Sequence, residues 1–450
     1  MRLLSCALLL GLSLPASALD LGDAYALALR NDPTFHAAIA ERDAGLENRA
    51  IGRAGLLPNL SYRYNSARND SEVTQTNQFG DNTSQRDYRS YSSTLTLQQP
   101  LFDWAAWADY RQGVAKALLA DERFRGQSQA LAVRLFGAYS DALFANEQIA
   151  LAQAQRRAYA EQLKLNERLI KGGEGTRTDV LETRARYELA QAQEIEASDN
   201  LDAALRSLQS IIGEPLEVAD LAPLAGHFRV QPLQPARFDA WRDLAVANNA
   251  ELASQRHALD AADQAIERQR AGHLPSLSAY ASKGRSSSSS ESSYNQRYDT
   301  DTIGIQLSMP LFAGGGVSAS TRQATAQRDN VRYQLDGQIA ETLNELRKQF
   351  NLCTSSTAKV RAYELAVDSA SELITATRKS VAGGERVNLD VLNAEQQLYS
   401  ARRDLAQARY DYMRAWLQVR YLAGTLEASD LQQLNNYFVS RGDLASNAAR

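Results

Sequence analysis

The chain has 450 residues, of which 44% are hydrophobic and 23% charged, and its 49 Lys and Arg against 53 Asp and Glu give a net charge of -4. The hydrophobic content is high enough for a large folded structure and excludes wholesale disorder. With 4 His and 2 Cys, the chain lacks the ligands that most metal and redox sites use. We therefore expect no cofactor. The chain also has no dense basic run, so we expect no nucleic-acid partner.

Residues 1–18 have the pattern of a secretory signal peptide. Arg2 is followed by an apolar stretch that ends at Leu14 and by small residues at 16–18, which are typical of a cleavage site. Cys6 lies too early to be the cleavage-site cysteine of a lipoprotein, so we expect no lipid anchor. After the leader no apolar run reaches the roughly 18 residues that a membrane-spanning helix needs. Any membrane span should therefore be built from strands.

Four motifs occur twice, in the same order, in the two halves of the chain. The matched segments are Asn31–Leu60 with Asn248–Leu277, Gln99–Phe102 with Met309–Phe312, Gly172–Leu181 with Gly383–Leu392, and Ile212–Gly213 with Ala423–Gly424. Such an ordered recurrence indicates a tandem duplication. We expect a first repeat over residues 19–212, an inter-repeat connection over 213–237, a second repeat over 238–424 and a C-terminal tail over 425–450.

Each half is expected to begin with a helix ended by a proline, followed by two strands around a polar loop. The expected strands lie at about 60–69 and 87–99 in the first half and at about 276–284 and 299–309 in the second. Apolar and polar residues alternate along these strands, which predicts one face toward lipid and one toward a lumen. The residues expected to face lipid are Tyr91, Leu95, Leu97, Ile303, Ile305 and Leu307. Tyr88 and Tyr298, at the loop ends, are expected to join an aromatic girdle at the membrane interface, although simple β-propensity also accounts for them.

A long helix follows the strands in each half, from Trp104 to about Ile170 and from Val317 to Val381. Each is free of proline and would be roughly 100 Å long. Apolar residues recur at every seventh position between Leu346 and Val381, which predicts supercoiled helix packing. Return helices are expected over residues 178–211 and 389–422.

A glycine pair precedes each return helix, Gly172 with Gly173 and Gly383 with Gly384. Because no Gly-Lys-Ser/Thr follows either pair, a phosphate-binding loop is a poor interpretation and a tight turn between helices is preferred. The His residues lack metal-ligand spacing, and no nucleophile motif is present, so we expect no enzyme.

One chain supplies four candidate membrane strands, which cannot close, since the smallest outer-membrane barrels have about 8 strands. Exposed strand edges are not tolerated in lipid, so the chain is expected to assemble with copies of itself or with another protein. Two copies would supply eight strands and three would supply twelve, and the residues alone do not decide between them. A structural coiled-coil protein of the envelope would have its strands in one block at a terminus, whereas here a pair of strands interrupts each half. A periplasmic adaptor would need a lipoyl-like β domain, which the sequence does not show.

The duplicated helix-strand-strand-helix plan, the Leu-Pro-x-Leu and Pro-Leu-Phe junctions and the glycine turns resemble the TolC-type outer membrane factor family. The resemblance implies a mixed α/β membrane protein: a homotrimer with a 12-stranded outer-membrane β-barrel continued by a long periplasmic α-helical barrel. It implies as partners a periplasmic adaptor protein, an inner-membrane ABC transporter or other pump, and outer membrane lipid. The absence of a lipoprotein cysteine and the general character of the sequence are more similar to the type I secretion branch of the family, which exports a protein such as a protease or lipase, than to the lipidated drug-efflux members. The alternative is the outer membrane component of a small-molecule or drug efflux pump.

The resemblance also implies a gate at the periplasmic end. Arg386 matches an arginine that bonds to a Thr-Asp pair, here Thr178 and Asp179, to hold the end closed. Asp390 matches the first acid of a constriction ring, and Asn393 stands where the family has a second acid. Helix caps and solvated charges are the alternative interpretation of the same residues.

Overall fold

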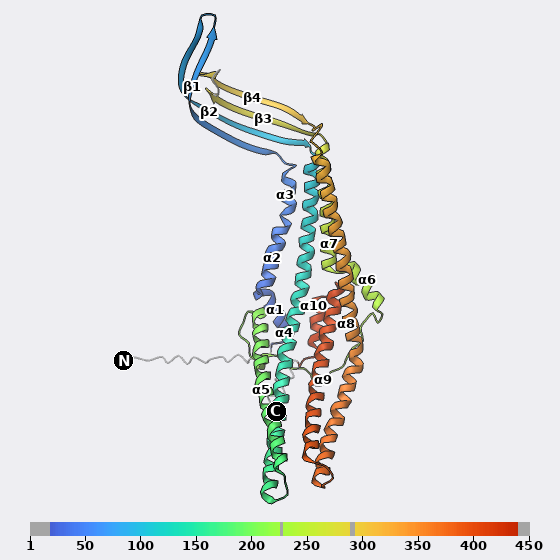
Figure 1. Ribbon diagram of the computed structural model, residues 1–450. Coiled ribbons are helices and arrows are strands. Elements are labelled where there is room, and N and C mark those ends of the chain that lie inside the picture. The colour runs from blue at the N-terminus through green and yellow to red at the C-terminus, as the bar shows by residue number, and fades with distance from the viewer. Residues whose placement is uncertain (1–18, 226–227, 289–292, 440–450) are drawn as a thin grey trace, which may run out of the picture. The chain divides into compact units, whose positions relative to one another are not determined.

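The computed structural model describes residues 19–225, 228–288 and 293–439, and the predicted leader lies outside them (Figure 1). The first half contains α1 (Leu21–Asn31), α2 (Pro33–Leu46), α3 (Asn48–Ala54), β1 (Asn59–Asn77), β2 (Gly80–Phe102), α4 (Trp104–Gly172) and α5 (Arg177–Ile212). The second contains α6 (Phe238–Asn248), α7 (Ala250–Arg270), β3 (Ser276–Ser287), β4 (Arg297–Ser308), α8 (Gly316–Ala382) and α9 (Asn388–Leu422), followed by α10 (Ala428–Asn435). The predicted order of elements is confirmed, and the four long helices agree with their predicted bounds to within two residues.

The chain divides into two compact units. One contains Met1–Ile39, Phe124–Ala250 and Ile339–Arg450, and the other contains Ala40–Arg123 and Glu251–Gln338. The second unit holds the sheet, and the first holds the turns that join α4 to α5 and α8 to α9.

The four strands form one antiparallel sheet in the order β1-β2-β3-β4. The polar loop predicted between residues 69 and 87 is wrong, because β1 and β2 continue as a two-stranded ribbon to a turn at residues 78–79. Polar side chains pair across this ribbon. Thr76 Oγ1 donates to Asp81 Oδ1 at 2.6 Å, and Arg68 Nη2 donates to Asp87 Oδ2 at 2.5 Å. Such cross-strand pairs stabilise strands whose composition alone is typical of a loop.

The loop predicted between Gly284 and Asp299 is also too long, since β3 runs to Ser287 and β4 begins at Arg297. Here too opposite charges pair across the strands, with Arg285 Nε donating to Asp299 Oδ1 at 2.8 Å.

The girdle predicted for Tyr88 and Tyr298 does not agree with the predicted lipid face, because the register places both tyrosines on the opposite, polar face of the sheet. The register of β2 is unbroken between Tyr88 and Leu97, so Tyr88 shares its face with Thr94 rather than with Leu95. Its ring packs edge-on against Tyr294, with centroids 5.3 Å apart. The alternation of faces along the strand, and not the position of Tyr88 beside a loop, therefore decides on which face of the sheet this tyrosine lies.

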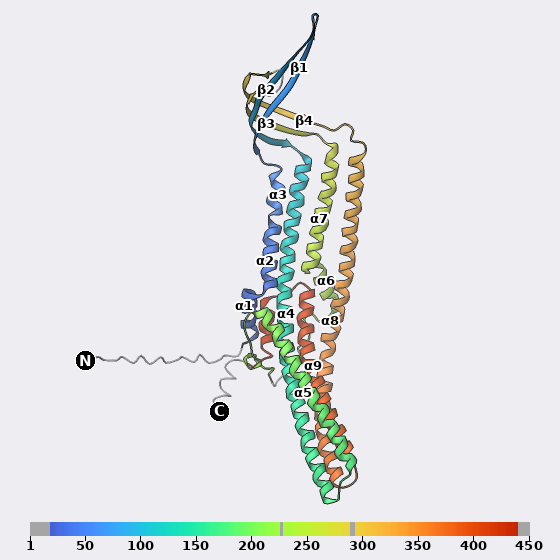
Figure 2. The same cartoon turned by 60° about the vertical axis from the view of Figure 1, so that its left-hand side comes forward.

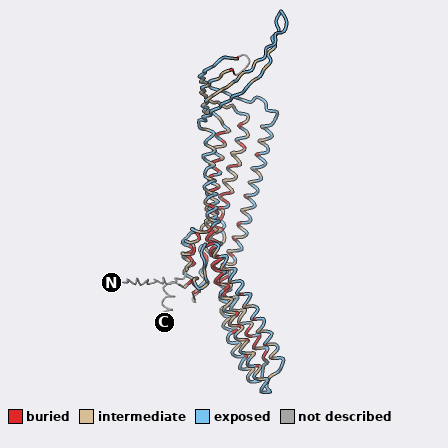
Figure 3. The backbone as a smooth tube through the Cα atoms, turned by 90° about the vertical axis from the view of Figure 1, so that its left-hand side faces the viewer, coloured by how far each residue is buried: buried red, intermediate tan, exposed pale blue. Residues whose placement is uncertain are grey.

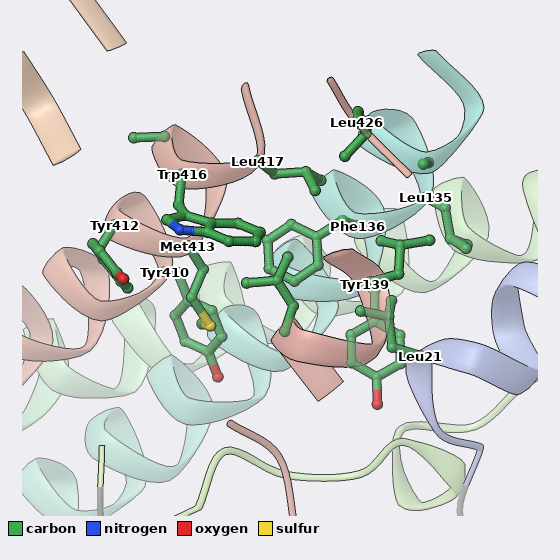
Figure 4. Close-up of a cluster of buried hydrophobic side chains, with 14 of the residues drawn as sticks. Leu21, Leu135, Phe136, Tyr139, Tyr410, Tyr412, Met413, Trp416, Leu417 and Leu426 are labelled. Carbon is green, nitrogen blue, oxygen red and sulfur yellow. The ribbon is translucent and has the colours of Figure 1, made fainter. Parts of the chain in front are cut away.

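The largest core lies in the first unit, where α4 meets α9, α1 and α10 (Figure 4). Tyr139 of α4 is fully buried, and its hydroxyl donates to Leu19 O at 3.1 Å and accepts from Ala222 N at 3.1 Å. Its ring also packs against Phe438, so the first part of the predicted tail belongs to the core. Figure 3, coloured by burial, shows buried residues concentrated in this part of the long helices.

The last carbonyl group of each return helix accepts a hydrogen bond from an asparagine near the start of the same repeat. Asn31 Nδ2 donates to Ile212 O at 2.7 Å, and Asn249 Nδ2 donates to Leu422 O at 2.9 Å. Gly213 and Gly424, which follow these helices, have φ of 77° and 69°, which favours glycine. The structure thus brings together two of the motifs that recur in the sequence.

Glycines let α2 and α3 approach α4 closely in the second unit. A Cβ on Gly113 of α4 would lie 2.3 Å from Asn48 O, and a Cβ on Gly45 would lie 2.2 Å from Ala120 Cβ. Real Cβ atoms do not make such contacts, so these backbones can meet only where a side chain is absent.

Gly113→Ala should therefore lower the stability of the folded protein by roughly 1–3 kcal/mol, because the added methyl forces α3 away from α4. Gly137→Ala is the matched control in the same helix, since a Cβ there has nothing within 4 Å. It should leave stability unchanged or raise it by about 0.5–1 kcal/mol. Thermal denaturation of the detergent-solubilised protein measures both, and equal losses would contradict the close α3–α4 contact.

Candidate functional site

The two turns that join the long helices to their return helices have the same backbone and lie at the same end of those helices (Figure 2). Gly173 and Gly384 have φ of 82° and 76°. Glu174 N donates to Leu169 O, and Glu385 N donates to Ser380 O, both at 2.9 Å. Each long helix therefore ends on a left-handed glycine with a Schellman-type hydrogen bond, and Gly172 and Gly383 come directly before it.

After the shared Gly-Gly-Glu, the first turn continues with Gly175 and the second with Arg386. A Cβ on Gly175 would lie 2.9 Å from Ile170 N, so the first turn has no room for a side chain there. Arg386 is exposed. Only the second turn can therefore present a long cationic side chain.

The first helical turns of α5 and α9 also differ. Thr176 is the N-cap of α5 and forms a capping box, in which Asp179 Oδ2 accepts from Thr176 N at 3.2 Å and from Thr176 Oγ1 at 2.6 Å. Asp390 is the counterpart of Asp179, but the residue before α9 is Val387, whose side chain makes no cap hydrogen bond. A capping box needs a polar first residue. The carboxylate of Asp390 is thus not used by its own helix cap, whereas one oxygen of Asp179 is.

The expected latch residues do not meet within one chain. Thr178 and Arg386 are exposed, Asp179 is half-buried, and in the described part of the chain no hydrogen bond or ion pair joins Arg386 to either of the others. Asn393, expected in the constriction ring, is exposed and accepts from Arg186 Nη2 at 3.2 Å. The alternative interpretation as a helix cap is correct for Asp179, which takes part in the capping box of α5. Thr178 does not, since the N-cap residue is Thr176.

A buried polar cluster just behind the turns was missed in the sequence. Asn388 Oδ1 accepts from Gln162 Nε2 at 2.7 Å, and Asn388 Nδ2 donates to Thr183 Oγ1 at 3.1 Å. Asn166 Nδ2 also donates to Thr183 Oγ1, at 2.8 Å. Because Asn166, Thr183 and Asn388 are buried, these bonds tie the start of α9 to both α4 and α5. Asn and Thr in a polar helix usually lie on its surface, so their identity alone did not indicate a buried cluster. The one sequence signal was that Gln162 and Asn166 are four residues apart and so lie on the same face of α4.

A second unexpected feature is an ion pair that occurs in both repeats with its charges exchanged. Arg184 Nη2 of α5 lies 3.2 Å from Glu167 Oε1 of α4, and at the matched positions Arg378 Nη2 of α8 lies 2.6 Å from Glu395 Oε1 of α9. The first pair is exposed, but Glu395 is buried, and burial raises the pKa of its carboxyl. The two helix pairs thus share one geometry with opposite charge.

The sheet presents an apolar face that the described residues leave open. Ile303, Ile305 and Leu307 are 89%, 74% and 68% exposed. Leu95 and Leu97 of β2 share this face and are exposed, and Tyr91 is half-buried. Further along the same face the apolar rows give way to Lys283 paired with Asp301.

None of the helices in the described part of the chain combines the length and apolar character that a membrane-crossing helix needs. Over the same residues no group of three or more His, Cys, Asp and Glu is placed to hold a metal ion.

The sequence was compared with protein-family models and with known proteins. The model described as "Outer membrane efflux protein" matches residues 24–214 and 241–425, once for each repeat. Alkaline protease secretion protein AprF of Pseudomonas aeruginosa is 58% identical, covering 96% of this chain and 90% of its own length. Proteases secretion protein PrtF of Dickeya chrysanthemi is 53% identical, covering 94% of this chain and 92% of its own length. Outer membrane protein TolC of Escherichia coli is 30% identical, covering 95% of this chain and 88% of its own length.

Among solved structures, the outer-membrane channel OprN superposes with a TM-score of 0.78 at 18% identity, covering 90% of each chain. This likeness concerns the fold alone, and it agrees with the long helices and four-stranded sheet described above. The chain belongs to the outer membrane efflux protein family of TolC-type channels, as an outer membrane transport protein whose helices stand in the periplasm.

Proposed function

We propose that this chain forms, as a homotrimer, the outer membrane exit duct of a type I protease secretion system. The observation that carries the proposal is the similarity, over nearly the whole chain, to two proteins that are both named for protease secretion. The duct is passive: a periplasmic adaptor and an inner-membrane ABC transporter deliver the protease, and this chain conducts it outward.

The sheet gives the physical argument for assembly with other copies, and the family resemblance gives their number as three. Its outer strands, β1 and β4, have no strand partner along their outer edges in the described chain. Because lipid satisfies no backbone N–H or C=O group, each edge must pair with a strand of another copy. Three copies close a 12-stranded barrel, with the Ile305 face toward lipid and the Gln306 face toward the lumen.

Expression of this chain in a strain that retains a type I protease, its adaptor and its transporter, but lacks their outer membrane component, should restore protease activity in the culture medium. The reason is that the exit duct is the one missing part. Culture supernatants and cell pellets are assayed separately. Protease retained in the pellet, together with recovered resistance to small toxic compounds, would favour small-molecule efflux instead.

The facing of β4 can be tested by charge insertion. Ile305→Arg should reduce assembled trimer in the outer membrane, because arginine on the lipid face costs roughly 2–4 kcal/mol near the bilayer midplane. Gln306→Arg, the adjacent residue on the polar face, is the matched control and should assemble normally. The band of intact trimer on an unheated gel measures both. Equal loss in the two variants would refute the assigned faces.

The latch is proposed to act between copies, since Arg386 does not reach Thr178 or Asp179 in its own chain. Asp179 Oδ2 is engaged in the α5 cap, so Oδ1 is the oxygen left for Arg386 of a neighbour. Charge-assisted bonds of this kind contribute about 1.5–3 kcal/mol where water is excluded. Asp390 and Asn393 of each copy then line the constriction that the latch holds closed.

Arg386→Ser should raise the resting conductance of the channel in planar bilayers without reducing trimer yield, because it removes the donor of the latch. Asp179→Ala should have the same effect, and the double variant should add little to either. Lys171→Ser removes an exposed cation just before the first turn and is the control that should leave conductance unchanged. Wild-type conductance in Arg386→Ser would place the latch elsewhere.

A further inference from the structure

The sheet face that carries Ile305, here called the outward face, changes character along the strands. Near the helices it is uncharged, and Leu97, Ala281 and Ile303 lie opposite one another on β2, β3 and β4. Toward the hairpin turns the same face carries a group of cations, here called the basic rim: Arg68, Arg89, Lys283, Arg285 and Arg297. All of these side chains are exposed. The basic rim therefore adjoins the apolar surface that the proposed barrel turns to lipid.

The length of β2 places the rim at the outer surface of the membrane. The helices join the sheet at one end and stand in the periplasm, so the hairpin end faces the cell exterior (Figure 1). From Phe102, which pairs with Leu277, to Tyr91 the outward side chains of β2 carry no charge. At ~3.4 Å per residue and a tilt of ~40°, this segment would span roughly 25–30 Å, close to the ~25 Å apolar band of such barrels. Arg89, the next outward residue after Tyr91, then lies at the level of the lipid headgroups.

Positive charge on the outward face of the ribbon is confined to this level. Beyond Arg68 and Arg89, the charged outward residues of β1 and β2 are all acidic: Asp70, Glu72, Asp81 and Asp87. Charges that only keep a hairpin soluble need no such separation of signs along it. The position of the cations therefore points to an anion at the membrane surface.

The acids close to the rim leave part of its charge unbalanced. Some rim cations form exposed ion pairs across the strands: Arg68 with Asp87, Lys283 with Asp301, and Arg285 with Asp299. Arg89 and Arg297 form no ion pair with any residue that the structure describes. Arg89 also lies directly opposite Arg68 in the register, and like charges at such positions destabilise a strand pair. An anion bound between strands would remove this repulsion.

We propose that the basic rim binds the phosphate groups of lipopolysaccharide, the phosphorylated glycolipid of the outer leaflet. The proposal rests on the barrel of the proposed function, which turns the outward face to lipid. A guanidinium group donates paired hydrogen bonds to phosphate oxygens, so Arg89 and Arg297 supply the main contacts. Exposed ion pairs are weak, so Lys283 and Arg285 can add contacts of their own.

The surface beside the rim identifies a lipid as the source of the phosphate. Tyr62 and Tyr64 of β1 share the outward face and are 65% and 60% exposed. Tyr62, Leu95 and Lys283 occupy one row across β1, β2 and β3, so apolar and cationic side chains alternate at the boundary. A free phosphate would contact only the cations, whereas a lipid with a charged head and acyl chains covers both kinds of side chain.

Lipid binding by the purified full-length trimer tests the proposal. Trimer that carries Arg89→Gln together with Arg297→Gln is compared with the parent protein in an uncharged detergent, with short-chain lipopolysaccharide as the probe. Native mass spectrometry counts the lipid molecules bound to each trimer. The double variant should bind the lipid roughly fivefold to tenfold more weakly, because it lacks both unpaired guanidinium groups.

Arg63→Gln is the matched control. Arg63 is an exposed arginine of β1 that lies opposite Thr94, on the face toward the lumen. Its replacement removes the same charge from the same sheet and should leave lipid binding unchanged. All three replaced side chains are exposed, so the trimer band on an unheated gel should be retained in every variant.

Two further probes identify the group that is bound. Lipid A stripped of its phosphates should bind the parent trimer as weakly as the intact lipid binds the double variant. Inorganic phosphate in excess should not displace the intact lipid, because phosphate alone makes none of the apolar contacts.

Equal lipid binding by the parent and the double variant, or full binding of the dephosphorylated lipid, would overturn the inference. Displacement by inorganic phosphate would overturn the lipid as the occupant of the rim. Each of these results leaves the proposed function standing. Absence of trimer from the outer membranes of cells that express the parent protein would instead overturn the proposed homotrimeric duct.

Discussion

The outer edges of β1 and β4 carry backbone N–H and C=O groups that no strand of the described chain pairs. Water or another strand can satisfy such groups, but lipid cannot. The exposed apolar face of the same sheet, with Ile303 and Ile305, is unfavourable in water. Edges and face together support the proposed arrangement, a sheet closed by copies of the chain and surrounded by lipid. In the proposed assembly every copy would contribute the same two helix pairs, α4 with α5 and α8 with α9.

The two repeats share a backbone and differ in their side chains, and the differences carry the proposed gate. Gly175 leaves the first turn without a side chain, while Arg386 stands at the same point of the second. Asp179 is engaged in a capping box, while Asp390, behind Val387, is not. In the proposed latch, the first of these two turns supplies the hydrogen-bond acceptor and the second supplies the donor.

The ion pairs on the helices also lie at matched positions of the two repeats and differ in their side chains. Glu167 with Arg184 and Arg378 with Glu395 occupy matched positions with exchanged charges. Only the second pair has a buried carboxylate, so its partner cannot be removed without leaving an uncompensated charge. Loss of Arg378 is therefore expected to cost more stability than loss of Arg184.

The sequence by itself determined the duplication, the order of elements, the ends of the long helices and the apolar face of β4. All of these follow from local signals: proline and glycine positions, a period of two and a period of seven. It did not determine how far β1 and β2 extend, since polar residues such as Thr76 and Asp81 become strand residues only through pairing across the ribbon. It also did not reveal the cluster of Asn166, Thr183 and Asn388, or the correct face of Tyr88. Those depend on which helices and strands come together in space, and only the tertiary structure decides that.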